Sequence, residues 1–332
     1  MAAFPDGVNR PVQYGQQLKA HAVYLSQYPL LPYSRIEEYF ADQLNIPISV
    51  GSLFNFNQEA AELIAALGAE DYIKAQLCAA PVIHVDETGV NVGGKRHWLH
   101  CASNARWTCL FPHQKRGVEA MDAMGILPGY RGIACHDHWK PYYQYNDCAH
   151  ALCNAHHLRE LEYAWDKDGQ QWAKVMQAFL LKLNEKVKDA GGQLPTQKER
   201  YYRKKYRDIL DDAEKECPPP DKSQRKAGQR GRIKRSKSRN LLERLREFED
   251  DILRFMVIDF VPFTNNRGEN DIRMTKVQQK ISGCFRSPEG AVIFSRIRGY
   301  VSSCRKQGLT ATHALTSLFQ STLPGIFSEC AE

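Results

Sequence analysis

Short segments rich in β-favouring apolar residues recur between residues 82 and 152, and their order constrains the fold more than any other feature. Tight turn signals at Gly93-Gly94 and Asn104-Ala105 separate the first three segments, which predicts an antiparallel meander. A helical pattern precedes the fourth segment, and another begins at Asn154 after the fifth. The order β-β-β-α-β-α-β-α predicts an α/β fold, a ribonuclease H-like mixed sheet flanked by helices.

Acidic residues stand at the ends of two of these segments. The apolar run Val82–Val85 predicts a short buried strand that ends in Asp86 and Glu87, and the fourth segment ends in Asp137. In an open sheet, ligands gather at the strand ends where the strand order switches. A carboxylate held there needs a metal ion, a basic side chain or hydrogen bonds, and the simpler alternative for each acid is a turn or a helix N-cap.

The first 79 residues carry helical patterns and predict an N-terminal helical subdomain. Ser34 followed by Glu37 has the pattern of a capping box, and a further helix is expected from Ser49. Two short helices around a tight break resemble a helix-turn-helix, although such pairs are common in proteins that do not touch DNA. A long helix is expected over residues 58–78.

The sheet is expected to occupy residues 80–164 and 258–332, interrupted by a helical insertion at 165–257. Apolar content collapses between residues 191 and 240, which predicts a loop, with a disordered basic arm at about 217–240. This arm carries the whole excess of the net charge of +7 and predicts a polyanionic partner, most simply DNA. The candidate DNA-binding residues in the arm and near the C-terminus are Arg225, Lys226, Arg230, Arg232, Lys234, Arg235, Lys237, Arg239, Arg273, Lys276, Lys280 and Arg286.

Compartment is indicated by what the sequence lacks. No run of about 18 apolar residues occurs and the N-terminus has no signal-peptide pattern, so we expect a cytoplasmic protein without a membrane partner. The ten cysteines lack the spacing of a disulfide scaffold and are expected to be thiols. Among them, Cys148 and Cys153 with His150 and His156 could be read as a zinc cluster, but no second pair at conventional spacing supports it.

Several motifs in a fixed order carry a resemblance to a known family. They are Pro11–Gly15 with Leu18–Ala20, His84–Thr88, His136–Trp139 with Tyr142, His150–His156, Thr264–Asn266 with Glu269 and Arg273, and Ser282–Ser287. With these motifs the chain resembles the DDE transposases of bacterial insertion-sequence family sixty-six.

The resemblance implies a function and a site. It implies that Asp86, Asp137 and Glu269 are catalytic acids that bind divalent metal, as two Mg²⁺ or Mn²⁺ ions, for cleavage at transposon ends and strand transfer into target DNA. It further implies supporting roles for Cys153, His156, His136 and Asn266, and a nucleoid-associated homo-oligomer on DNA, with accessory proteins encoded by the same element as further partners.

Two departures from the family pattern bear on activity. Gly268 stands where the family has Ala, and Asn270 where it has Arg. Family members also usually carry further N-terminal sequence with a zinc-binding, DNA-contacting region, which this chain is expected to lack because Met1 stands just before the motif at Pro11. The alternatives are therefore a ribonuclease H-like nuclease that cuts without joining, and a truncated, inactive relative that only binds DNA.

Overall fold

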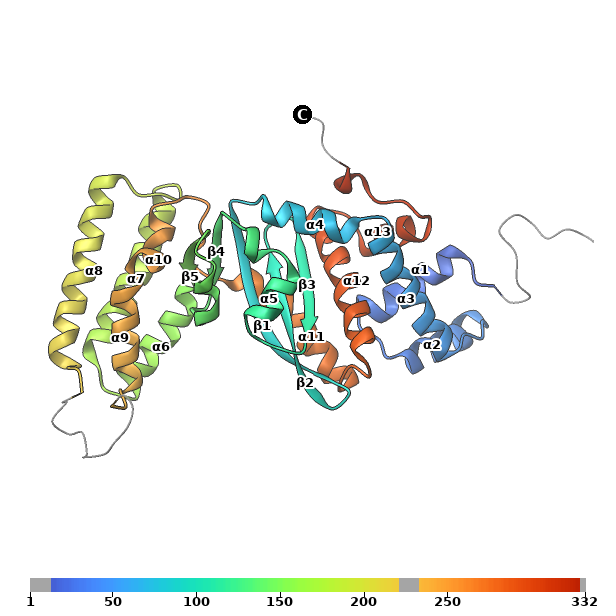
Figure 1. The fold of residues 1–332 in the computed structure, drawn as a ribbon, viewed down its shortest axis with the longest axis horizontal. Helices are drawn as coiled ribbons and strands as arrows, with labels where there is room; N and C mark the ends of the chain where they lie inside the picture. The colour runs from blue at the N-terminus through green and yellow to red at the C-terminus, as the bar shows by residue number, and fades with distance from the viewer. Residues whose placement is uncertain (1–12, 221–232, 329–332) are drawn as a thin grey trace, which may run out of the picture. The chain divides into compact units, whose positions relative to one another are not determined.

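A computed structural model describes residues 13–220 and 233–328 (Figure 1). Its five strands form one sheet in the order β3-β2-β1-β4-β5. The pair β2–β3 is antiparallel, and the pairs β1–β4 and β4–β5 are parallel. The predicted α/β fold with a mixed, ribonuclease H-like sheet is confirmed. The strands are β1 (Val82–Val92), β2 (Lys95–Ser103), β3 (Thr108–His113), β4 (Ile133–His136) and β5 (Ala149–Leu152).

The hairpin that opens the sheet forms where the sequence predicts it. Gly93 and Gly94 take positive φ angles of 56° and 80° between β1 and β2, a conformation that glycine adopts without steric cost. However, β1 continues to Val92, so Asp86 lies within the strand and the prediction that the strand ends there is wrong. Gly89, which the sequence analysis took as the end of the strand, lies inside it.

The connection from β4 to β5 differs from the predicted order of elements. Only residues 137–148 join the two strands, and they contain the short 3-10 helix η2 (Lys140–Gln144) in place of an α-helix. Pro141 stands in the first turn of η2, and Tyr142 is buried against the fold. This length is close to the minimum for a parallel crossover, which leaves no room for a longer helix.

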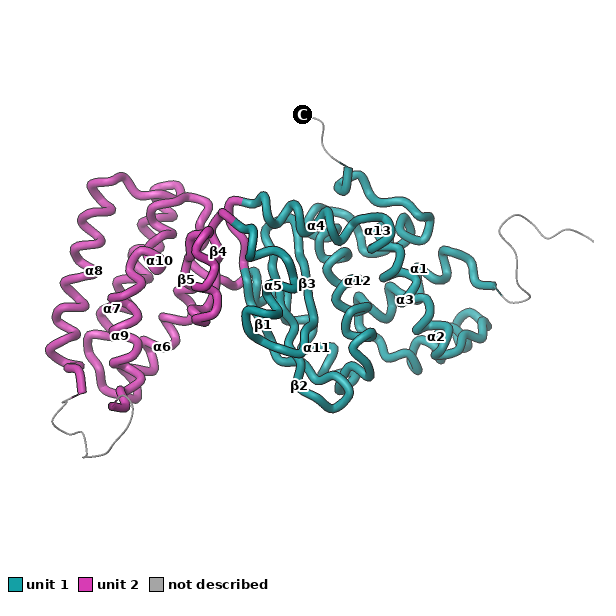
Figure 2. The backbone as a smooth tube through the Cα atoms, viewed as in Figure 1, with its two compact units in different colours: residues 1–80, 85–130, 267–332 teal, residues 81–84, 131–266 magenta. Residues whose placement is uncertain are grey.

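The chain forms two compact units, which Figure 2 distinguishes by colour. The first unit comprises residues 1–80, 85–130 and 267–332. Its helices are α1 (Gln16–Gln27), α2 (Tyr33–Leu44), α3 (Val50–Ala66), α4 (Ala69–Cys78), α5 (Val118–Met124), α11 (Asn266–Ser282), α12 (Pro288–Lys306) and α13 (Ala311–Phe319), with the 3-10 helices η1 (Leu127–Gly129) and η5 (Gly325–Phe327). Helix α12 packs on β3, where Thr108 N–H donates to Ser303 Oγ at 3.0 Å.

The helical start of the first unit follows the sequence in part. Ser49 caps α3 by accepting the Ser52 N–H, as expected. The capping box is absent, because α2 begins at Tyr33 after Pro32, whose fixed φ suits the residue before a helix. In place of the expected single helix over 58–78, the structure has the end of α3 and then α4. Gly68 adopts φ +75° between them and interrupts the helix.

The second unit comprises residues 81–84 and 131–266. Its helices are α6 (Asn154–Asp166), α7 (Gln171–Asp189), α8 (Thr196–Glu216), α9 (Lys237–Glu247) and α10 (Glu249–Leu253), followed by η4 (Arg254–Met256). Their apolar side chains form one core with β4 and β5. None of the helices in the described part of the chain is both long and apolar enough to cross a membrane.

Helix α8 lies where the sequence predicted a loop. Its buried residues are Tyr206, Leu210 and Ala213, a stripe too narrow to stand out from the charged residues around it. Those charged residues are good helix formers, so low apolar content did not mean loss of helix. Similarly, α9 begins at Lys237, inside the predicted arm, while residues 221–232 lie outside the described chain.

Candidate active site

Asp86 lies on β1 just beyond the parallel pairing with β4. That pairing joins Val82, Ile83 and His84 to Ile133, Ala134 and Cys135. Two residues later, the Asp86 Oδ1 accepts the N–H of Glu87 at 2.9 Å. The preceding residues are buried and Asp86 itself is half-buried. The buried residues of β1 that precede Asp86 therefore hold its backbone in place.

The neighbouring acid Glu87 has a different partner. Its side chain is only 2% exposed, and Arg116 donates Nε and Nη2 to its Oε1 at 2.9 and 2.5 Å. The Arg116 guanidinium also lies 4.7 Å from the ring centroid of Trp98, a cation–π distance. Glu87 therefore anchors β1, and Arg116 is a supporting residue that the sequence analysis missed.

Asp137 lies in a tight turn directly after β4, in the second unit. Its Oδ1 accepts the N–H of Trp139 at 2.9 Å, which closes a local turn of the type that aspartate favours. Between them, His138 has φ +77°, in the left-handed region that is uncommon for residues other than glycine. The turn is thus held in one conformation by the acid itself.

Buried His136 supports this turn through a chain of hydrogen bonds. The His138 N–H donates to His136 Nδ1 at 3.1 Å, so that nitrogen must be the acceptor. His136 Nε2–H then donates to His150 Nδ1 at 3.1 Å, and His150 Nε2 lies 3.3 Å from the Tyr145 carbonyl. Burial holds the pKa of His136 well below its usual value. His136 is therefore a neutral imidazole that fixes the turn.

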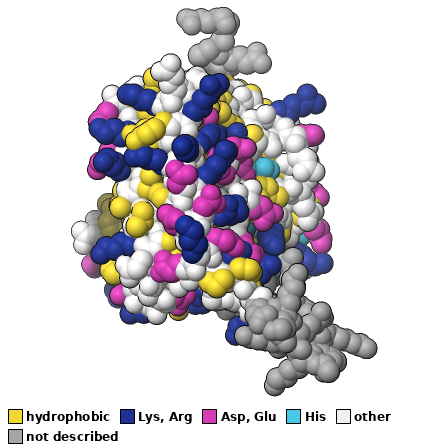
Figure 3. All heavy atoms as spheres, turned by 90° about the vertical axis from the view of Figure 1, so that its left-hand side faces the viewer, with side chains coloured by type: hydrophobic (Ala, Val, Ile, Leu, Met, Phe, Trp, Pro, Cys, Tyr) yellow, Lys and Arg dark blue, Asp and Glu magenta, His cyan; other side chains and the backbone are white. Residues whose placement is uncertain are grey.

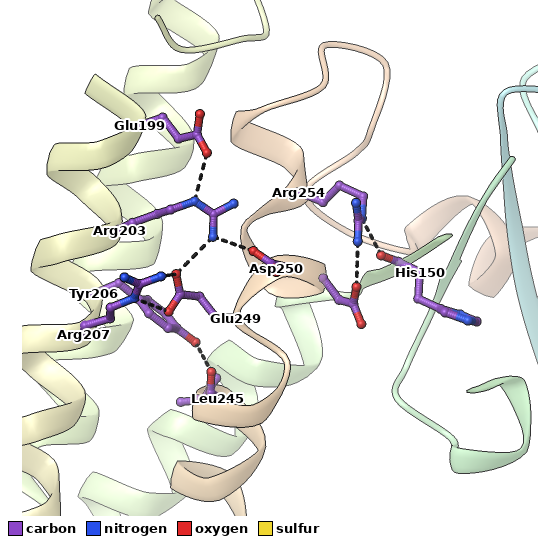
Figure 4. Close-up of polar contacts among 10 residues, drawn as sticks. His150, Glu199, Arg203, Tyr206, Arg207, Leu245, Glu249, Asp250 and Arg254 are labelled. Carbon is purple, nitrogen blue, oxygen red and sulfur yellow. Dashed lines mark hydrogen bonds and ion pairs between the residues drawn. The ribbon is translucent and has the colours of Figure 1, made fainter. Parts of the chain in front are cut away.

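Figure 4 shows how helix contacts hold the strand that carries His150. Arg254 donates Nε to the His150 carbonyl at 2.6 Å and Nη2 to Asp251 Oδ1 at 2.8 Å. On α8, Arg203 bonds Glu249 at 3.0 Å, and it also bonds Glu199 and Asp250. The ion pairs of Arg203 tie α8 to α10, and Arg254 of η4 links α10 to β5 by its ion pair with Asp251 and its hydrogen bond to the His150 carbonyl.

Arg244 of α9 brings a positive charge close to Asp137. Burial lowers the pKa of Arg244, and the negative charge of Asp137 opposes that shift. Arg244 also forms an ion pair with Glu160 of α6. Burial, reinforced by Arg244, lowers the pKa of His138 to about 4, so His138 is uncharged at neutral pH. Nothing in the sequence distinguishes Arg244 from the many other charged residues in this stretch.

Cys153 and Asn265 connect the loop before α11 to the sheet. The Asn265 N–H donates to Cys153 Sγ at 3.0 Å, and its Oδ1 lies 2.8 Å from His84 Nδ1. Asn265 is 1% exposed, whereas Asn266 is exposed. Of the two asparagines in the motif, Asn265 is the one that makes structural contacts. His156 lies one helical turn after Cys153 and donates its N–H to the Cys153 carbonyl at 3.1 Å.

Glu269 lies in the first turn of α11, in the first unit, and is half-buried. Further along this helix, Asp271 accepts a hydrogen bond from Lys306 Nζ of α12 at 2.6 Å. Both side chains are mostly buried, at 14% exposed for Lys306 and 12% for Asp271. This ion pair locks α11 onto α12 and fixes the rotation of the helix that presents Glu269. Asp86 and Glu269 belong to the first unit and Asp137 to the second, so their joint metal site stays a prediction.

The predicted DNA-binding residues of the second unit differ in their exposure. Arg239 is 9% exposed, and it forms ion pairs with Glu214 and Glu243. Arg235 also pairs with Glu243, whereas Lys234 and Lys237 are exposed. Figure 3 shows Lys and Arg intermixed with Asp and Glu on one face of the molecule. Arg225, Lys226, Arg230 and Arg232 lie outside the described residues.

The basic residues of the first unit follow α11. Arg273, Lys276 and Lys280 are exposed on this helix, and Arg286 is exposed shortly after it. Lys276 Nζ donates to the Gly89 carbonyl of β1 at 2.6 Å. Three cations thus lie along α11, the helix whose first turn carries Glu269, and a fourth follows its end.

The amino-acid sequence matches a known protein family and a curated protein. The family model described as "Transposase IS66 family" matches residues 11–293, a range that includes Asp86, Asp137 and Glu269. An uncharacterized protein of Sinorhizobium fredii, y4jO, is 35% identical over 75 residues. That match covers 23% of this chain and 23% of the length of the curated relative.

Proposed function

Because the chain belongs to the IS66 family of transposases, we propose that it is a DDE transposase that cleaves DNA at transposon ends and transfers the cut strand into target DNA. Asp86, Asp137 and Glu269 act as its three catalytic acids. The proposal joins the family match to the way in which the chain presents each carboxylate.

One observation carries the proposal, namely the register of β1 and β4. The strands are parallel, and His84 pairs with Cys135. Two residues beyond this pair, β1 reaches Asp86, and the other chain segment reaches Asp137 directly after the end of β4. Neighbouring parallel strands in register carry equivalent positions side by side, which supports a shared site for the two acids at the point where the ladder ends.

The chemistry of the donors fits a hard divalent cation. Carboxylate oxygens are preferred by Mg²⁺ and Mn²⁺, and three acids leave positions for water and phosphate. Asp86 and Asp137 each use Oδ1 to accept one backbone N–H, and a carboxylate has further lone pairs for a metal ion. Asp86, Asp137 and Glu269 would hold the ions. When bound, two such ions activate the attacking hydroxyl and stabilise the leaving oxygen of a phosphodiester.

The remaining residues of the site position these acids. Arg116 and Glu87 hold β1, His136 holds the turn at Asp137, and Arg244 supplies a cation beside that acid. His136 and His138, which flank Asp137, are uncharged at neutral pH, so neither would compete with a metal ion for this carboxylate.

Exposed cations supply the contacts to DNA in this proposal. The exposed cations that follow Glu269 in the sequence are Arg273, Lys276 and Lys280 on α11 and Arg286 after it. Their positive charges suit phosphate oxygens. In the second unit, Lys234 and Lys237 are exposed and offer further contacts, whereas Arg235 and Arg239 are already paired with glutamates. Assembly as a homo-oligomer on DNA remains part of the proposal.

Metal binding tests the assignment of the acids directly. Mn²⁺ titrations followed by electron paramagnetic resonance would compare the full chain with Asp86→Asn, Asp137→Asn and Glu269→Gln. We expect each change to weaken Mn²⁺ binding at least about tenfold, or about 1.4 kcal/mol. Exposed Asp147→Asn and Glu119→Gln are the matched controls and should bind as the unchanged chain does. Equal affinities in all six proteins would refute the metal site.

Reaction products test the function itself. With a DNA substrate carrying the ends of the element, the unchanged chain should give metal-dependent cut ends and joined products, and Asp86→Asn should give neither. Cut ends without joined products would indicate a nuclease. DNA binding that weakens with salt no more than that of an acidic control protein would refute the phosphate contacts.

A further inference from the structure

The two halves of α8, in the second unit, carry opposite charge. Residues 198–207 contain six Lys or Arg and one acid, Glu199, whereas residues 208–216 contain five acids and one cation, Lys215. Cations near the N-terminus and acids near the C-terminus are the reverse of what a helix dipole favours. The stability of the helix by itself therefore does not explain this distribution of charge.

The acids of the C-terminal half have partners within the second unit. Glu216 accepts two backbone N–H groups at the start of α7. Glu214 forms an ion pair with Arg239, and Asp211 forms one with Arg246, both on α9. These contacts join α8 to α7 and α9, so the acidic half of α8 has a structural role.

The cations of the N-terminal half fall into two groups. Arg203 and Arg207 form ion pairs with acids of α10, which Figure 4 shows. By contrast, Lys198, Arg200 and Lys204 are exposed and form no ion pair with any residue that the structure describes. Arg200 and Lys204 are also four residues apart on the helix, a spacing at which like charges repel. Packing within the second unit gives these three cations no role.

An exposed aromatic ring lies among these cations. Tyr201 is 52% exposed, and Lys205 Nζ lies 4.6 Å from the centroid of its ring. The helical repeat places Tyr201, Lys204 and Lys205 on the side of α8 away from Tyr206 and Leu210, which are buried. Exposed cations that alternate with an aromatic side chain are typical of surfaces that bind nucleic acid.

We infer that this face of α8 binds the phosphate backbone of duplex DNA without reading its sequence. The α8 basic face consists of Lys198, Arg200, Tyr201, Lys204 and Lys205. Its cations and the Tyr201 hydroxyl can all donate to phosphate oxygens. From Lys198 to Lys205 the face is about 10 Å long, which corresponds to about three base pairs. The inference rests on the proposed function, because it takes the bound polyanion to be DNA.

A pair of variants with equal charge tests the α8 basic face. The test variant removes exposed, unpaired cations and carries Lys198→Gln, Arg200→Gln and Lys204→Gln. The control variant removes exposed cations of the second unit that are already paired with aspartates, and it carries Lys167→Gln, Lys186→Gln and Lys215→Gln. Each variant loses three positive charges, so a general effect of net charge is the same in both.

The measurement is the affinity for a duplex of about 20 base pairs, by fluorescence anisotropy with a chelator present, over a range of salt concentrations. We expect the slope of log K against log salt to fall by about 2–3 in the test variant, close to one for each lost phosphate contact. The control variant should change it by less than about 1. Equal slopes in the two variants would overturn the inference.

Acetylation of lysines, read by mass spectrometry, locates the contact in the unchanged chain. Duplex DNA should slow the acetylation of Lys198 and Lys204 and should not slow that of Lys167 and Lys215. Equal protection of all four lysines, or of none, would overturn the inference. Protection by an RNA duplex and not by DNA would also overturn it, because the partner would then be RNA.

Failure of the catalytic proposal would look different. Asp86→Asn should keep the protection of Lys198 and Lys204 by DNA even though it loses metal binding. A chain that cuts and joins DNA without this protection would refute only the α8 basic face. A chain that shows the protection but binds no Mn²⁺ would refute only the metal site.

Discussion

The ion pair between Glu87 and Arg116 offers the sharpest test of how β1 is held beside its catalytic acid. Arg116→Met keeps the length of the side chain but removes its charge and both hydrogen bonds to Glu87. The Glu87 carboxylate, 2% exposed, would then lose its cation. We expect the first unit to lose stability and β1 to lose protection around Asp86.

The magnitude follows from the exposure of the two partners. Breaking a fully buried pair by removing one partner costs about 3–5 kcal/mol. Arg116 is 39% exposed, so water screens part of the interaction, and we expect about 2–3 kcal/mol, including the cation–π contact with Trp98. Arg35 and Glu38 form a matched exposed pair, at 71% and 66% exposed, and Arg35→Met should cost no more than about 0.5 kcal/mol.

Urea unfolding of the full chain, with peptide-resolved hydrogen exchange to locate the loss, would measure both changes. Exchange should rise over residues 82–92 in Arg116→Met and not in Arg35→Met. Glu87→Gln combined with Arg116→Met should recover part of the stability, because no buried charge is then left alone. The reasoning is wrong if the two arginine variants lose equal stability, or if the double change adds its single costs.

Two further predictions concern the second unit and α12. Burial lowers the pKa of His136 well below 6.5 and that of His138 to about 4, so the folded unit binds fewer protons than the unfolded chain between pH 6.5 and 4. Its stability should therefore be fully present above pH 6.5 and fall as the pH drops toward 4, and hydrogen exchange of residues 133–152 should show a shallower pH dependence in His138→Phe. On α12, a Cβ at Gly299 would lie 3.0 Å from the Thr108 carbonyl oxygen, so Gly299→Ala should lower the free energy of unfolding by about 1–3 kcal/mol. Gly290→Ala, with 3.6 Å to the nearest atom, should not, and thermal unfolding that shifts equally in both would contradict this packing.

The strands and the first hairpin of the sheet could be predicted because neighbouring residues alone specify them. The Gly93-Gly94 turn and the apolar runs around it need only their own residues to specify a hairpin. By contrast, α8 was missed because just Tyr206, Leu210 and Ala213 face its core, and a three-residue stripe is lost among charges. The break at Gly68 was missed because glycine is tolerated within helical patterns, and its positive φ is visible only in the structure.

Arg116 and Arg244 could not have been predicted from the sequence, because their partners lie far away along the chain. Arg116 follows Glu87 by 29 residues, and His84 and Asn265 are 181 apart. A charged residue whose partner is unknown looks the same as a solvated one, as Arg239 and Arg244 show. The choice of Asp86, Asp137 and Glu269 rests on the family motifs, and it stays a prediction.

The arginines of the chain differ in exposure, and the amino-acid composition does not show this difference. Arg239 lies against two glutamates and a backbone carbonyl, so its charge is used within the protein, while Arg273 and Arg286 remain exposed. Counterion release on DNA depends on the cations that reach phosphate, not on the number in the sequence. The net charge of +7 therefore does not measure how many cations are available to DNA. Removal of the exposed cations that follow Glu269 should reduce the salt dependence of DNA binding.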